Sequence, residues 1–488
     1  MRPAVRAALE RAPLAVLAAR PSYLWFVVGT VCIGAFMGQL DAGIAQLVLP
    51  TLQAQFAVSL ASISWVALVY LLVLAAALPI FGRLADLYGR KLLYTLGFLV
   101  FIVGSGLCGF AGSLAALLAA RVLQAVGAAM LQANSVAIIT AAAGPARRGR
   151  ALGVQGAAQA VGLAFGPALG GLLIQTLGWR WIFWINVPAG LLGMFLGWFV
   201  LPRTAGLAAD ARGFDWKGAL LLAPGLAALL LALSELPNWG GSARFFGVAA
   251  LGIACLAGFV VHERRAGAPL VDLSLFASRG FRAGNLAGLI SYALLFGVFL
   301  IAPYALERGY RETPLAAGLR LTVIPLALAV AAPFAGALSD RFGARRLTVG
   351  GMLLAAAALG ALALSLDGRT ATLAILTAAF AAFGIGQGAF TAPNNSAIMG
   401  SAPPGRLGAA GGVLNVMRAL GTSLGVALGA SLLAWRIGIF GTAGGDTLSA
   451  TAATVVAGSR ETLLALAALA LVAAAISALR ERTAATVG

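Results

Sequence analysis

The sequence predicts an all-α, polytopic membrane protein in which two six-helix halves flank two inserted central helices. Composition is the first observation behind this fold class, because 61% of the 488 residues are hydrophobic and only 10% are charged. A soluble globular chain is about half apolar and about a quarter charged. The composition therefore excludes a soluble enzyme, a disordered chain and a collagen-like chain.

The second observation is a series of fourteen apolar runs, each long enough to cross a bilayer. A transmembrane helix needs about 20 predominantly apolar residues. The runs are continuous and lack the alternation of a membrane β-barrel, so each is expected to form a helix. They lie at about 24–49, 62–81, 93–114, 116–142, 151–176, 182–202, 217–234, 243–261, 284–306, 315–338, 347–366, 371–398, 409–435 and 462–479.

The third observation is an internal repeat. Residues 82–91 follow the second run and residues 336–346 follow the tenth, and both contain Gly-x-Leu-x-Asp-x-x-Gly before basic residues. The pair Gly162 and Gly166 in the fifth run recurs in the thirteenth, within residues 421–425. Parallel halves of six helices are a known transporter plan, with the substrate site between the halves near the midplane.

The repeat and the runs together predict the organisation of the chain. In order, it comprises a cytoplasmic segment at 1–23, the first half at 24–202, two inserted helices with flanking loops at 203–283, the second half at 284–479 and a cytoplasmic tail at 480–488. The net charge is +18, and the basic residues stand in short groups between runs. Most of these groups share the side of the N-terminus, which places both termini in the cytoplasm. They form no continuous basic face, so nucleic acid is not an expected partner.

Motifs in nearly every part of the chain carry a family resemblance. They are Leu40–Pro50, 82–91, Arg121–Gly127, Gly162–Gly171, Trp179–Gly190 and Asn415–Gly425. In order and spacing they resemble the major facilitator superfamily, and within it the fourteen-helix drug:proton antiporters of the EmrB/QacA type. Three positions depart from the family pattern: Gly43 and Gln46 replace threonine and asparagine, and Ala125 replaces glycine.

The resemblance implies a secondary transporter, not an enzyme. It would export lipophilic cationic or neutral drugs across the bacterial inner membrane by alternating access, in exchange for protons. The alternative is a proton-coupled exporter of one endogenous metabolite, such as a siderophore or an antibiotic. Substrate, protons and the lipid bilayer are the implied partners, a periplasmic adaptor protein is left open, and the implied oligomeric state is a monomer.

No cofactor is expected, because the proton gradient would drive transport. The sequence contains no Gly-x-x-x-x-Gly-Lys-Ser/Thr nucleotide-binding motif. Its single histidine and three cysteines show no metal-site spacing, so no metal is expected either.

Asp41 is the acid that lies well inside an apolar run, and Arg121 and Arg418 are the basic residues that do. Ionisable groups within transmembrane helices are costly and are functional candidates. Desolvation disfavours a charged carboxylate, so Asp41 is expected to bind and release the coupling proton in competition with a cationic drug. By resemblance, Arg121 belongs to a proton-relay motif. The alternatives are a structural Asp41 paired with a fixed arginine, and an Arg121 that extends to the outer interface.

Other motif residues are assigned to conformational control. The functional interpretation is a latch between the halves that stabilises the outward-open state; the alternative is charge that only sets orientation. The latch residues are Gly82, Asp86, Gly89 and Arg90, with Asp340 and Arg341 as their weaker counterpart. Gly82 and Gly89 would permit a tight turn and close helix approach, and Asp86 would suit a helix N-terminus.

The fifth run has three glycines on one face, Gly162, Gly166 and Gly170, and Pro167 favours a kink beside them. Together they are expected to form a hinge and seal between the halves, although ordinary close packing in lipid gives the same pattern. Arg418 is either a conformational element of the second half or a structural partner of Asn415 or a carbonyl.

Polar and aromatic side chains within the apolar runs are the candidates for the substrate cavity. Each is as compatible with an ordinary interhelical contact. They are Gln46, Gln159, Tyr292, Asn394, Asn395 and Asn415.

Overall fold

The computed structural model describes residues 12–203, 215–267, 270–271, 273–403, 407–440 and 448–479. Within these ranges the regular elements are helical, and fourteen spans are long and apolar enough to cross a membrane. The predicted all-α fold with fourteen transmembrane helices is therefore confirmed. The two ends of the predicted domain plan, at 1–11 and 480–488, lie outside the described residues.

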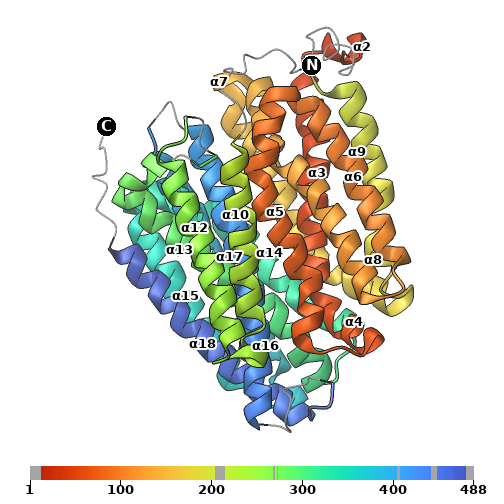
Figure 1. Ribbon diagram of the computed structural model, residues 1–488, viewed down its shortest axis with the longest axis vertical. Helices are drawn as coiled ribbons and strands as arrows, with labels where there is room; N and C mark the ends of the chain where they lie inside the picture. The colour runs from red at the N-terminus through yellow and green to blue at the C-terminus, as the bar shows by residue number, and fades with distance from the viewer. Residues whose placement is uncertain are drawn as a thin grey trace.

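The helices run antiparallel along the long axis of the molecule (Figure 1). In the first half they are α2 (Ala15–Ala18), α3 (Tyr23–Leu47), α4 (Leu49–Phe56), α5 (Leu60–Tyr88), α6 (Arg90–Phe110), α7 (Leu114–Thr176), α8 (Trp181–Trp184) and α9 (Asn186–Val200). The inserted region contains α10 (Trp216–Ser234), α11 (Leu236–Trp239), α12 (Ala243–Glu263) and the 3₁₀ turn η1 (Leu273–Ala277). The second half contains α13 (Arg279–Pro303), the π-helix η2 (Tyr304–Gly309), α14 (Pro314–Phe342), α15 (Ala344–Ser365), the 3₁₀ turn η3 (Thr370–Thr372), α16 (Leu373–Gly400), α17 (Leu407–Phe440) and α18 (Ala452–Ala478).

Side-chain caps fix where many of these helices begin. Ser59, Ser113 and Thr313 each accept a hydrogen bond from a backbone N–H in the first turn of the helix that follows. Such an acceptor satisfies one of the N–H groups that the first turn of a helix leaves without a partner. The caps stand just before apolar runs, and each fixes the residue at which its helix begins.

The repeated motif, which follows the second and the tenth apolar run, forms a sharp turn between long helices. Gly82 and Asp86 lie within α5, and the chain turns at Gly89, whose φ is 108°. The same turn recurs at Gly343, with φ of 82°, between α14 and α15. A side chain at positive φ is strained, so glycine is needed at both turns. Because one residue makes each turn, the motif is mostly helical.

The fourth and fifth spans both lie within α7 and are separated by a kink at Gly144, where φ is 62° and ψ is 178°. The sequence predicted a loop between them. The structure instead gives the spans Leu114–Gly144 and Arg150–Thr176 with only a short helical connection. Gly144 adopts the conformation that reverses the chain, and the apolar runs on either side then pack as separate helices.

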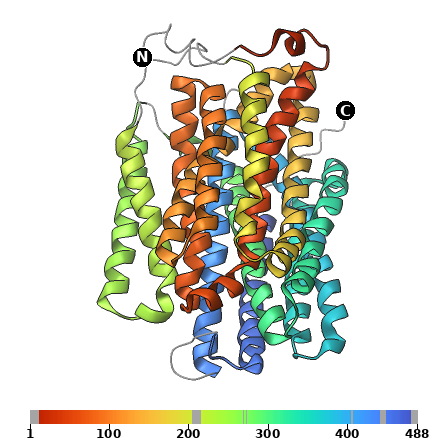
Figure 2. The same ribbon diagram turned by 90° about the vertical axis from the view of Figure 1, so that its right-hand side faces the viewer.

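The two inserted helices flank the bundle rather than entering it. Figure 2 shows α10 and α12 (yellow-green) standing together along one side. α10 packs against α5 and α17, and the hydroxyl of Ser431 donates a 2.6 Å hydrogen bond to the carbonyl of Leu233. α12 packs mainly on α10 and exposes apolar side chains such as Phe246 and Ile253. An apolar exposed face of this kind suits contact with lipid.

Glycines set the closest helix crossings, and they do so within each half. A side chain at Gly162 would meet the Phe36 carbonyl of α3, and one at Gly166 would meet Gly43 of α3. In the second half, side chains at Gly421 or Gly425 would likewise meet backbone carbonyls of α13. The two halves therefore repeat the same crossing. The predicted seal between the halves is wrong for Gly162, Gly166 and Gly170, because all three face α3.

The molecule has two ends along its long axis. The Gly89 end contains the turns at Gly89 and Gly343, and the Pro50 end contains α4 and α8. Across the halves, α5 packs on α17 and α7 packs on α14. These contacts between helices far apart in the sequence bring the polar residues of both halves to one central space.

Candidate functional site

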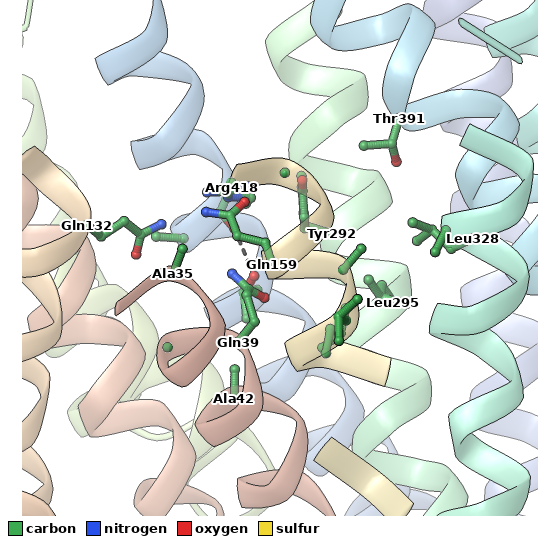
Figure 3. A pocket seen from close by; sticks show the side chains of 18 of the residues that line it. Ala35, Gln39, Ala42, Gln132, Gln159, Tyr292, Leu295, Leu328, Thr391 and Arg418 are labelled. Carbon is green, nitrogen blue, oxygen red and sulfur yellow. Dashed lines mark hydrogen bonds between the residues drawn. The ribbon is translucent and has the colours of Figure 1, made fainter. Parts of the chain in front are cut away.

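A cavity of about 660 Å³ lies between the two halves, lined by residues from the middle of several helices. Figure 3 shows part of its lining. Helices α3, α5, α6 and α7 line it from the first half, and α13, α14, α16 and α17 from the second. Both the position and the volume fit a site for a drug-sized molecule. Its polar lining residues are Gln39, Tyr70, Gln132, Ser135, Gln159, Ser291, Tyr292, Gln387, Thr391, Asn395, Arg418 and Thr422.

The halves touch directly at the Pro50 end. A side chain at Gly318 of α14 would meet the carbonyl of Pro167, and one at Gly171 would meet the carbonyl of Pro314. Nearby, Arg308 Nη2 donates to the carbonyl of Pro50 over 3.2 Å. The cavity lining runs the other way, to Gly336 and Asn395 near the Gly89 end. The Pro50 end is therefore closed in this conformation.

Asp41 and Arg121 form a buried ion pair beside the cavity. The distance between Arg121 Nη1 and Asp41 Oδ2 is 2.8 Å, and the two side chains are 1% and 3% exposed. Gln124 Nε2 donates to the other carboxylate oxygen of Asp41 at 2.9 Å, and Asn186 Nδ2 does so at 3.4 Å. The structure thus unites the two residues assigned to proton coupling, which stand 80 positions apart in the chain. Both carboxylate oxygens of Asp41 therefore accept hydrogen bonds, and Arg121 supplies the counter-charge.

The remaining contacts of Arg121 link the pair to the cavity wall. Its Nε donates to the carbonyl of Val66 at 3.0 Å, and its Nη1 also donates to Gln124 Oε1 at 2.7 Å. The guanidinium carbon lies 4.2 Å from the ring centroid of Tyr70, which itself lines the cavity. Arg121 is fully buried, so the alternative in which it extends to the membrane interface is wrong. The Tyr70 ring therefore stands between the ion pair and the cavity.

The predicted cavity residues divide into two groups. Gln159, Tyr292 and Asn395 line the cavity. Gln46, Asn394 and Asn415 are not among the lining residues, which corrects the sequence assignment. Asn394 Nδ2 donates to the carbonyl of Gly284, and Asn415 Oδ1 accepts from Arg418. Gln46 is buried in α3, and its Oε1 has no hydrogen-bond partner among the described residues.

Arg418 forms the structural pairing with Asn415 and also lines the cavity, and its conformational role stays a prediction. Its Nη2 donates to Asn415 Oδ1 at 3.0 Å, the structural pairing that the sequence allowed. It also lines the cavity, with its guanidinium carbon 5.7 Å from the ring centroid of Tyr292. Figure 3 shows Arg418, Tyr292 and Gln159 converging on one side of the cavity.

The residues of the predicted latch lie at the Gly89 end. The side chains of Asp86 and Asp340 lie outside the described residues, although their backbones belong to the last turns of α5 and α14. Asp86 is thus not at the N-terminus of its own helix. A side chain at Gly82 would meet nothing, so the expected close approach is absent there. Arg90 begins α6 and is half-buried, whereas Arg341 is exposed in the last turn of α14.

Sequence reasoning missed several polar residues, and the structure places all of them except Glu307 at or near the site. Gln124 and Asn186 contact Asp41. Both belong to motifs recognised in the sequence, so the motifs could have indicated them as site residues. Gln39, Gln132 and Gln387 line the cavity and could have been found only as further polar residues in apolar runs. Glu307 stands just beyond its apolar run, yet the π-helix η2 carries it into the protein. Its Oε1 is buried without a hydrogen-bond partner among the described residues.

Comparison with known proteins places this geometry in a family. The model of the Major Facilitator Superfamily matches residues 31–271 and 284–485. The chain is 36% identical over 411 residues to the riboflavin transporter RibZ of Clostridioides difficile, covering 84% of this chain and 88% of that protein. It is 34% identical to a multidrug resistance protein B homolog of Mycobacterium tuberculosis, covering 84% of this chain and 76% of that protein. It is 32% identical to the tetracenomycin C resistance and export protein of Streptomyces glaucescens, with coverage of 87% and 78%.

Solved structures share the fold at low sequence identity. A bacterial homolog of the human lysosomal transporter Spinster, inward-facing and unoccupied, has a TM-score of 0.68 at 17% identity, covering 94% of this chain and 97% of that one. An autoinhibited peptide transporter of the POT family also has a TM-score of 0.68 at 17% identity, with coverage of 96% and 99%. Family model, relatives and fold agree: the chain is a multi-pass membrane transporter and not an enzyme, and it belongs to the major facilitator superfamily.

Proposed function

We propose that the protein exports lipophilic small molecules from the bacterial cytoplasm in exchange for protons. The observation that carries this proposal is the buried Asp41–Arg121 pair beside a central cavity that both halves line. Relatives named for multidrug resistance and for tetracenomycin C export support export as the direction. The proton gradient is the proposed energy source, without a cofactor.

The proposed coupling step is protonation of Asp41. A neutral carboxyl binds Arg121 far more weakly than a carboxylate does, because the charge-assisted bonds between them are lost. The guanidinium would then shift against the ring of Tyr70, and α3 and α5 would move at the cavity wall. Both oxygens of the Asp41 carboxylate accept hydrogen bonds, and Asp41 is outside the cavity lining in this conformation. Coupling is therefore proposed to be indirect, in place of direct competition between drug and proton.

The proposed orientation places the Gly89 end in the cytoplasm, with both termini on that side of the inner membrane. The basic residues beside the turns at Gly89 and Gly343 support this orientation through the positive-inside rule. The closed Pro50 end would then face outward, and the cavity would load from the cytoplasmic side. The latch residues Asp86 and Arg90 are proposed to act at the opposite stage, when the Gly89 end closes.

The second candidate is a proton-coupled exporter of one endogenous metabolite. The name of the riboflavin transporter RibZ, a relative at 36% identity, favours this candidate. A monomer is proposed in both cases, with or without a periplasmic adaptor protein.

Export in inverted membrane vesicles tests the proposal. We expect vesicles that contain the protein to accumulate a neutral lipophilic dye such as Nile red when respiration acidifies their lumen, and an uncoupler to abolish the uptake. Growth of the bacterial cells that supply the vesicles, in the presence of unrelated toxic compounds, separates the two candidate functions. Protection against many compounds supports drug export, and protection against one compound supports metabolite export. Dye uptake that persists at full rate with the uncoupler would contradict proton coupling.

A further inference from the structure

The wall of the central cavity carries charge of one sign. Among the described residues that line it, Arg418 is the only charged side chain, and the other polar groups are amides and hydroxyls. The buried acid of α3, Asp41, is held by Arg121 and lies outside the lining. A positively charged molecule in this cavity would meet a like charge and no counter-charge. In the low-dielectric interior of a membrane protein, that repulsion is stronger than in water.

Most of the hydrogen-bond donors of Arg418 have no acceptor among the described residues. A guanidinium carries five N–H donors in a planar fork, and the described residues accept one bond from it, through Asn415 Oδ1 at 3.0 Å. No carboxylate among the described residues forms an ion pair with it. The side chain is half-buried at the cavity wall, beside Gln159 and Tyr292 (Figure 3). An unpaired cation in the middle of a membrane protein is costly, so an oxygen of a bound molecule would stabilise it.

Aromatic rings give the cavity a second recognition feature. The Tyr292 ring lies beside the Arg418 guanidinium, and Tyr70, Phe101 and Phe296 also contribute to the lining. Such side chains stack against flat conjugated ring systems. Amides such as Gln39 and Gln159 both donate and accept hydrogen bonds, so they tolerate varied polar groups on the edge of such a ring.

We infer that the cavity binds planar aromatic compounds that carry no positive charge and that present an acidic or carbonyl oxygen to Arg418. This inference rests on the proposed transport function and names its substrate class. It replaces the cationic drug expected from the sequence, because that expectation relied on Asp41 as the counter-charge. A charge-assisted bond to a guanidinium is stronger than a neutral one, so acidic members of the class should bind most tightly.

Equilibrium binding to the purified full-length protein in lipid nanodiscs tests the inference. Fluorescein and rhodamine 123 share a xanthene ring and differ in charge, and fluorescence anisotropy reports the binding of both. We expect fluorescein to bind at least about tenfold more tightly than rhodamine 123. Arg418→Gln should remove most of that preference, whereas Arg418→Lys should keep part of it. Arg436→Gln is the matched control, because Arg436 lies on the same helix against Trp435, outside the cavity lining.

Three results would overturn the inference: equal or tighter binding of rhodamine 123, binding of neither dye, or an unchanged preference in folded Arg418→Gln protein. The comparison of the two dyes on the unsubstituted protein stands even when a variant fails to fold. Binding needs no proton gradient, so these results leave proton coupling untouched. Conversely, gradient-independent Nile red uptake would contradict the proposed function and leave the charge preference intact.

Discussion

Arg121→Met is expected to lower the free energy of unfolding by about 3–5 kcal/mol, because it leaves the Asp41 carboxylate buried without its cation. Asp41 is 3% exposed, and Gln124 and Asn186 alone cannot neutralise its charge. Unfolding in mixed micelles by a strong detergent measures this loss. Arg436→Met is the control, since that arginine packs over a half-exposed Trp435 and has no buried partner in the described chain.

The double variant Asp41→Asn/Arg121→Met separates the contribution of the ion pair to the free energy of unfolding from the contribution of side-chain packing. Asparagine removes the unpaired charge, so the double variant is expected to recover a large part of the stability that Arg121→Met loses. Losses that simply add would show that the two residues do not stabilise each other. An Arg121→Met protein as stable as the Arg436→Met control would contradict the pairing altogether.

Gly318→Leu is expected to force the halves apart at the Pro50 end. Any side chain at this position meets the backbone carbonyl of Pro167, and the Leu47 side chain also lies close to it. The conformation with a closed Pro50 end should therefore lose population, and transport should stop because alternating access needs both conformations. Leucine itself favours the helix over glycine by about 1 kcal/mol, so loss of helix is not the expected cause.

The distance between spin labels on the two halves measures this opening. Gln55 and Thr370 are exposed positions at the Pro50 end, one in each half, and cysteines there can carry the labels in a background without the native cysteines. Gly318→Leu should lengthen the main distance by several ångströms. Gly360→Leu is the control, because a side chain at Gly360 meets nothing. An unchanged distance in the Gly318 variant would show that this contact does not hold the Pro50 end closed.

The number and type of helices followed from the sequence because the bilayer leaves few alternatives. Long apolar runs between polar turns must satisfy their own backbone hydrogen bonds, and helices do so within each run. The ends of the runs were harder to place. Helices such as α5 extend well past their apolar residues to Gly89, because helical structure continues into the polar motif. Only the positive φ of the glycine ends it.

The candidate site was predictable in part. Asp41 and Arg121 stood out because charges are rare in apolar runs, but their contact depends on how α3 and α7 pack. The sequence also did not show which face of each helix lines the cavity. Because α3 is apolar nearly all round, its sequence does not distinguish Gln39, which lines the cavity, from Gln46, which is buried in the protein interior. Glu307 was missed because the π-helix lengthens its span past the apolar run.

Proton movement during substrate exchange by Asp41→Asn protein tests the central claim most directly. The protein is reconstituted in liposomes with a pH-sensitive dye inside, and an outward substrate gradient drives exchange. Glu307→Gln is the matched control, because it also neutralises an acid in an apolar segment but lies outside the Asp41 network and the cavity lining. We expect the unsubstituted protein and Glu307→Gln to move protons with substrate, and folded Asp41→Asn protein to move none. Proton movement that survives in Asp41→Asn and disappears in Glu307→Gln would contradict the account and assign coupling to Glu307.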